Sequence, residues 1–206
     1  MSGWTAQVDI WAKGAHLPIY SFTQHDMTHT LDGDGAYNFA LLGGASYSNV
    51  LFHKSLGTNS GQGTQFTLDM MLFIDHPENS QALEFAVLQS HGKKWYKFST
   101  QAQFSGGVWR AWSGGTTHHW VASTASCPRF PAMTWNHLVF EYEIVNDQTH
   151  FISVSVNGNK QYMNLYETPE SLAHASENIT THFQIDGNRA EAPYKVWIDK
   201  LNVTTN

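Results

Sequence analysis

The stretch Trp135–Met163, WNHLVFEYEIVNDQTHFISVSVNGNKQYM, alternates apolar and polar residues along two runs joined by a short polar turn. Alternation with a period of two is typical of β-strands with one buried face. The dipeptide Asn157-Gly158 favours a two-residue hairpin turn. The stretch therefore predicts antiparallel strands that bury one face. The expected inward residues are Leu138, Phe140, Tyr142 and Ile144, then Ile152, Val154 and Val156.

Similar short runs fill the rest of the chain and are broken by Gly, Asn, Asp and Pro. The clearest is 64–74, TQFTLDMMLFI, in which every second residue is apolar. Thr168-Pro169-Glu170 suits a helix cap and first turn, and predicts a short helix over 169–175. We predict an all-β fold, a two-sheet antiparallel β-sandwich with at most one or two short helices, forming a single domain over 1–206. The other expected strands are 4–12, 36–44, 49–56, 82–89, 95–104, 107–112, 117–123, 181–187 and 194–203.

Composition excludes several functions. The net charge is −6 and no basic stretch offsets it, so we expect no DNA or RNA partner. No window approaches the ~18 apolar residues of a membrane span. The opening residues MSGWTAQVDIW lack the pattern of a signal peptide. We expect no zinc site among the 12 His, since the adjacent His118 and His119 of one strand would point to opposite faces and chelate poorly. The oligomeric state is not specified by the sequence.

Two motifs carry a resemblance to a known superfamily. The Trp-led strand at 135 with its hairpin ending in Val-Asn-Gly, and the closing run VWIDKLNV at 196–203, resemble laminin-G-like and concanavalin A-like jelly rolls. The run LEFAVLQ…FSTQAQF…HHWVASTASCPRF…W is similar to secreted acidobacterial proteins of that superfamily. The resemblance implies a concave sheet face where relatives bind sugars, and an extracellular or periplasmic location.

Cysteine usage departs from that resemblance. The similar proteins carry a second cysteine near the position of Ala102, whereas Cys127 is the only cysteine here. We therefore expect a buried, inert thiol rather than a disulfide.

The predicted binding surface combines tryptophan with amide and carboxylate side chains. Sugars need aromatic faces for their C–H side and polar groups for their hydroxyls. Glu84, Trp95, Gln101 and Gln103 supply this chemistry on adjacent outward strand faces. At least half of the eight Trp are expected in the core, with Trp135 as a core anchor. Residues expected to join from neighbouring strands or edge loops are Trp109, Arg110, Trp112, His118, Trp120, Gln184 and Asp186.

The leading hypothesis is a lectin-like, carbohydrate-binding domain, and two alternatives stay open. A glycoside hydrolase needs two carboxyls, and the E-x-D-x-x-E motif of the laminarinase branch is missing. A cross-strand pair of Glu84 with Asp186, Glu141 or Glu143 would be required. A polysaccharide lyase would use His118 or His119 as base and Arg110 as charge neutraliser. The other alternative is a structural or adhesion domain. Binding ranks first because 95–135 contains no acid.

Metal binding is limited to a possible structural Ca²⁺. By resemblance, Asp199 in IDKL would supply a carboxylate beside carbonyls of the early glycine turns. Asp32 and Asp34 in LDGDG are spaced carboxylates, but the full EF-hand pattern is missing, so a plain turn is favoured. The cofactor prediction is therefore none, or one structural calcium.

Overall fold

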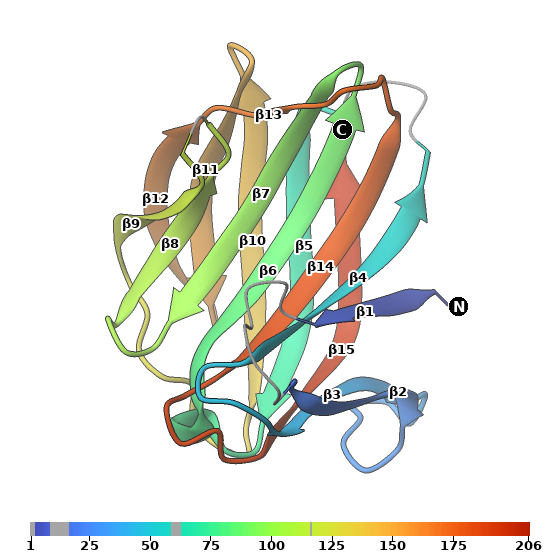
Figure 1. Ribbon diagram of the computed structural model, residues 1–206, viewed down its shortest axis with the longest axis vertical. Helices are drawn as coiled ribbons and strands as arrows, with labels where there is room; N and C mark the ends of the chain where they lie inside the picture. Colours follow the sequence, from blue (N-terminus) through green and yellow to red (C-terminus); the bar gives the residue numbers. More distant parts are fainter. Residues whose placement is uncertain (1–2, 9–16, 59–62, 116) are drawn as a thin grey trace.

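The computed structural model describes residues 3–8, 17–58, 63–115 and 117–206, and shows two antiparallel sheets packed face to face (Figure 1). This confirms the predicted all-β sandwich. The larger sheet has the order β1 (Trp4–Val8), β4 (Asn49–Gly57), β14 (Asn178–Gly187), β6 (Ser80–His91), β7 (Lys94–Gln103), β8 (Val108–Ser113), β9 (His119–Ser126), with β13 (Glu170–Ser171) beside β7. The smaller sheet has the order β12 (Asn159–Glu167), β11 (Gln148–Val156), β10 (Trp135–Val145), β5 (Gln65–Ile74), β15 (Tyr194–Thr205), β3 (Ala36–Gly43), β2 (Ile19–Asp26).

One apolar core lies between the sheets. Alternate residues of each strand point into it, as the period-two pattern predicts. Phe85 of β6 lies 5.1 Å from Phe140 of β10, and Phe98 of β7 lies 5.1 Å from Tyr142 of β10, ring centre to ring centre. Because inward residues fill the core, the intervening residues of the larger sheet form its outer face, where polar and aromatic side chains gather.

The β11–β12 hairpin follows the predicted turn and departs from the predicted phase. Asn157 and Gly158 both have positive φ, 51° and 80°, as a type I′ turn requires. A bulge opposite Glu141 and Tyr142 of β10 adds one residue to β11 between Phe151 and Ser153 and shifts the alternation. Phe151 and Val154 therefore enter the core, and the prediction that Ile152 would face inward is wrong.

The predicted helix over 169–175 is wrong. Glu170 and Ser171 form the short strand β13, paired with Trp95 and Lys94 of β7. Their segment crosses one end of the larger sheet (Figure 1). Local capping signals are weak, and strand pairing and side-chain contacts override them here. The one helix among the described residues is a 3-10 turn, η1 (Pro77–Asn79).

Other expectations have mixed outcomes. Of the strand expected at 4–12, β1 covers Trp4–Val8, and 9–12 lies outside the described residues. Trp135 does not anchor the main core, because its strand phase turns it to the outer face of the smaller sheet, against Phe73 and Trp197. Cys127 is a fully buried free thiol, as predicted, and burial raises its pKa to about 12, which disfavours the reactive thiolate.

No helix in the described parts of the chain combines the length and apolarity needed to span a bilayer.

Candidate functional site

A groove of about 570 Å³ lies on the outer face of the larger sheet. This volume is within the usual range of small-molecule sites, about 300–1,000 Å³. Strands β1, β4, β14, β6, β7, β8 and β9 of this sheet contribute to its walls, because their outward residues share one surface. Its polar and aromatic lining includes Glu84, Trp95, Lys97, Trp112, Trp120, His182, Gln184 and Asp186.

Strand register aligns the polar residues at the middle of this face. Gln184 of β14 lies opposite Glu84 of β6, which lies opposite Gln101 of β7. Arg110 of β8 is next in the same row. The Gln101 Nε2 donates to Glu84 Oε1 at 3.0 Å, and the Gln184 Nε2 donates to Asp186 Oδ1 at 2.8 Å. The amides thus orient two carboxylates on the groove face.

Three half-buried tryptophans line the same groove. Trp112 and Trp120 are paired residues of β8 and β9, and their rings meet edge to face with centres 5.1 Å apart. Trp95 lies on β7, and the Lys97 Nζ sits 3.8 Å from the centre of its ring. The groove therefore offers aromatic surface on three neighbouring strands beside hydrogen-bonding groups.

Glu170 connects these aromatic residues. Its Oε1 lies 2.6 Å from the Lys97 Nζ and accepts from the Trp112 Nε1 at 3.4 Å. The His118 Nε2 lies 3.8 Å from the same oxygen. Gly114 makes room, because a Cβ there would lie 2.8 Å from the Glu170 Cγ. No sequence signal marked Glu170, which was assigned to a helix.

His182 is an uncharged imidazole at neutral pH. Burial, then electrostatic interactions with His53 and Lys97, lower its pKa from 6.5 to about 3. Its ring centre lies 5.7 Å from that of His53, and its Nε2 lies 3.2 Å from the Thr180 Oγ1. The alternation that turned Gln184 and Asp186 outward would also have selected His182, which the sequence prediction omitted.

The sequence-predicted binding residues are only partly brought together. Six of them line the groove: Glu84, Trp95, Trp112, Trp120, Gln184 and Asp186. Gln101 is buried and bonded to Glu84, while the Gln103 Nε2 donates to the Ser105 Oγ at the strand end. Arg110 and His118 lie outside the lining.

The prediction that Trp109 contacts a ligand is wrong. Trp109 has no exposed surface and packs edge to face on Phe140 in the core, with ring centres 5.5 Å apart. The physical reason is phase, because residues 109 and 112 of one strand point to opposite sides of the sheet.

Only one of the three predicted catalytic pairs lies in the groove. Glu141 and Glu143 belong to β10 of the other sheet, so their pairing with Glu84 across the groove is wrong. Glu84 and Asp186 line the groove and lie on the diagonal of the β6–β14 ladder. Diagonal neighbours have Cα atoms ~7–8 Å apart. The proposed lyase base His119 is exposed, and its Nδ1 lies 2.6 Å from the Thr117 carbonyl oxygen.

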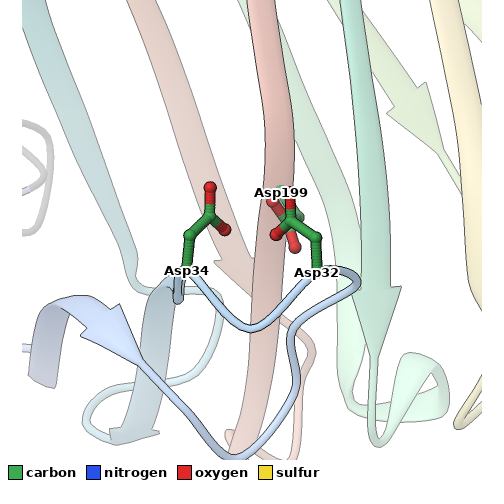
Figure 2. A group of neighbouring side chains, drawn as sticks. All are labelled: Asp32, Asp34 and Asp199. Atoms are coloured by element: carbon green, nitrogen blue, oxygen red, sulfur yellow. The ribbon is translucent and has the colours of Figure 1, made fainter.

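A second group of acidic residues lies on the smaller sheet. Asp32 and Asp34 rise from one loop towards Asp199 of β15, and carboxylate oxygens of all three lie within 4.8 Å of one another (Figure 2). Gly33 and Gly35 between and after them have φ of 80° and 87°, which a side chain would strain. The buried Asp199 accepts from the Leu31 backbone N–H at 2.8 Å and thereby fixes this loop.

These oxygens fit calcium by donor type, because Ca²⁺ prefers carboxylates and carbonyls. A lysine competes for the same position. A bulge follows Asp199, and Lys200 has a positive φ of 52°, which turns its side chain to the acidic residues. The Lys200 Nζ pairs with Asp32 and lies 4.0 Å from Asp34 Oδ2. Calcium would have to displace this ammonium.

No protein-family model and no curated sequence matches the chain. Solved structures do. An alginate lyase from Aplysia kurodai aligns with TM-score 0.62 and 9% identity over 91% of this chain and 87% of its own. An endo-β-1,4-glucuronan lyase from Trichoderma reesei aligns with 0.59 and 12% over 97% and 90%. Arcelin-5, a lectin-like defence protein from Phaseolus vulgaris, aligns with 0.53 and 9% over 100% and 99%. The predicted concanavalin A-like jelly roll is thus confirmed as the fold.

Proposed function

We propose that the groove on the larger sheet binds a glycan and that the protein acts as a lectin-like module. The observation that carries this proposal is the presence of three tryptophans and the Glu84, Gln184 and Asp186 side chains in one groove. Similarity in fold to two polysaccharide lyases and a lectin-like protein supports it.

Each part of the groove matches one side of a sugar ring. The half-buried indoles of Trp112 and Trp120 give apolar surface for the C–H face of a pyranose. Hydroxyls on the rim of the ring need acceptors and donors held in place. Glu84 and Asp186 are oriented by amides, so these carboxylates present fixed acceptors. Prior ordering of both parts lowers the entropy lost on binding.

A glycan array followed by titration calorimetry tests this proposal. Trp120→Ala should weaken binding by about thirtyfold, since a buried aromatic anchor commonly contributes ~2 kcal/mol. Tyr162→Ala is the matched control, because Tyr162 is 63% exposed on the opposite sheet and its loss should leave affinity unchanged. Absence of binding to any glycan, with the protein folded, favours a structural or adhesion role instead.

A glycan-active enzyme is the second candidate, favoured by the diagonal placement of Glu84 and Asp186 in the groove. A glycoside hydrolase uses two carboxyls on either side of the bond to be cleaved. If the pair is catalytic, Glu84→Gln abolishes release of reducing ends from a bound glycan. Gln81→Glu adds a charge in the same groove and serves as a control that should not remove activity. Trace activity that persists in Glu84→Gln excludes this mechanism.

A further inference from the structure

The groove has one cationic side chain of the lysine or arginine type among its described lining residues, and that cation already has a counter-ion. The Lys97 ammonium lies 2.6 Å from Glu170 Oε1, and the two side chains are 19% and 15% exposed. Its other contact is the Trp95 ring, 3.8 Å from the Nζ. Lys97 is therefore engaged on two sides before any ligand arrives.

Glu170 is fixed in position and does not swing freely away from Lys97. Its backbone pairs with Trp95 in the β13–β7 ladder. Its carboxylate also accepts from Trp112, and Gly114 packs against its side chain. The strand pairing, the Trp112 hydrogen bond and the Gly114 contact together hold Glu170 in place. Moving its carboxylate away from Lys97 would therefore break these contacts as well as the ion pair.

The remaining basic group on this part of the wall carries no charge at neutral pH. The pKa of His182 is lowered to about 3, first by burial, and its Nε2 faces the Thr180 hydroxyl at 3.2 Å. His182 therefore serves as a neutral hydrogen-bonding group. Arg110 lies in the row beyond Gln101, outside the groove lining.

We propose that the groove prefers glycans built of uncharged sugars over uronate chains. This inference rests on the proposed glycan-binding function. A uronate carboxylate leaves water favourably only when a cation receives it, and here Glu170 already neutralises the Lys97 cation. An uncharged sugar presents hydroxyls, which match the amide-held carboxylates and the neutral imidazole of this wall. Under this proposal the groove differs in ligand class from two proteins of similar fold, which are named as lyases of glucuronan and of alginate.

The test compares pairs of oligosaccharides that differ at one carbon. Cello-oligosaccharides and β-1,4-glucuronan oligosaccharides of equal length share linkage and differ only in CH₂OH against carboxylate at C6. β-1,4-mannan and polymannuronate oligosaccharides form a second pair. Calorimetry should show at least about tenfold tighter binding of the uncharged member, which corresponds to ~1.4 kcal/mol. Tighter binding of the uronate member, lost in Trp120→Ala, overturns the preference and leaves glycan binding standing.

Glu170→Gln tests the cause of the preference. The amide keeps the shape of the side chain but no longer neutralises Lys97, so the uronate-to-neutral affinity ratio should rise about tenfold. Glu167→Gln removes a carboxylate three residues away in the same segment and should leave the ratio unchanged. An unchanged ratio in a folded Glu170→Gln variant overturns the role given to the ion pair.

The double variant Lys97→Met/Glu170→Met provides a second route if Glu170→Gln does not fold. It removes the cation and its counter-ion together, so the uronate-to-neutral affinity ratio should stay near that of the wild type. A tenfold fall of this ratio would show that Lys97 receives the uronate carboxylate and would overturn the proposal. If no oligosaccharide of either kind binds the wild-type protein, the proposed function fails together with the preference.

Discussion

The groove face of the larger sheet and the outer face of the smaller sheet hold similar residue types in different pairings. On the smaller sheet, three basic side chains each pair with a carboxylate. His137 lies 2.8 Å from Asp69, and Lys160 lies 2.5 Å from Glu141. His150 lies 2.8 Å from Glu143 and stacks on Tyr166 with ring centres 4.0 Å apart. On that face, these basic and acidic side chains therefore pair with one another.

In the groove the carboxylates of Glu84 and Asp186 accept from amides, and His182 contacts a hydroxyl. The Lys97–Glu170 pair is the groove's counterpart of the outer-face ion pairs. The two faces therefore differ less in residue type than in the partners of their charged groups.

The acid sensitivity of His182 gives the largest expected effect. Its folded pKa of about 3 is below the ordinary 6.5, so between these values the unfolded chain binds a proton that the folded chain excludes. Stability contributed by the neutral imidazole is thus lost as pH falls through this window, with an upper limit of ~1.4 kcal/mol per pH unit.

Urea unfolding at pH 7, 6 and 5 measures this dependence for wild type and His182→Gln. The substitution should flatten the fall in unfolding free energy with decreasing pH. Thr180→Val is the matched control, since it removes the hydroxyl partner and keeps the imidazole, and should retain the wild-type slope. Equal slopes for wild type and His182→Gln would show that the groove imidazole is not held neutral.

The sequence predicted the sheets better than the site because alternation is a local property. Residues 64–74 are enough to define β5 and its buried face. The phase within 107–112 was not assigned, since Gly106-Gly107 interrupts the pattern, and Trp109 was consequently placed with Trp112. The β11 bulge likewise moved Ile152 out of phase without a sequence signal.

Non-local contacts account for the rest of the site. Glu170 reaches Lys97 and Trp112 from a segment that the sequence assigned to a helix. Its local signals described a cap, while its role depends on residues 58–73 positions earlier in the chain. Lys97 was not assigned to the site, because its partner was unknown. Sequence alone thus selected three groove tryptophans together with Glu84 and Asp186, and missed the Lys97–Glu170 ion pair beside them.

Addition of calcium tests the acidic group on the smaller sheet. The expected change in stability is smaller than that for His182. Calcium binding at Asp32, Asp34 and Asp199 stays a proposal, in which Lys200 competes with the ion. Lys200→Asn removes the ammonium, adds a carbonyl oxygen and tolerates the positive φ. Calcium at ten times its Kd should then stabilise the variant by ~1.4 kcal/mol, and wild type by less.

Thermal unfolding with and without Ca²⁺ reads out this difference. Lys195→Asn removes the same charge from the same strand and should respond as wild type does. If Lys200→Asn gains nothing from calcium over wild type, Lys200 is not the competitor and the cluster serves to hold its loop.

The Lys160–Glu141 pair should give the smallest effect. Its side chains are 42% and 38% exposed, so water screens their attraction and the pair should contribute little to stability. Lys160→Met should therefore change the urea midpoint at pH 7 only slightly. The pKa of Glu141 is lowered, first by its bond to Lys160, so the variant should lose part of its acid dependence. A large loss at neutral pH would mean that the outer face is held by its ion pairs, and the contrast with the groove would then be one of stability as well as of partner choice.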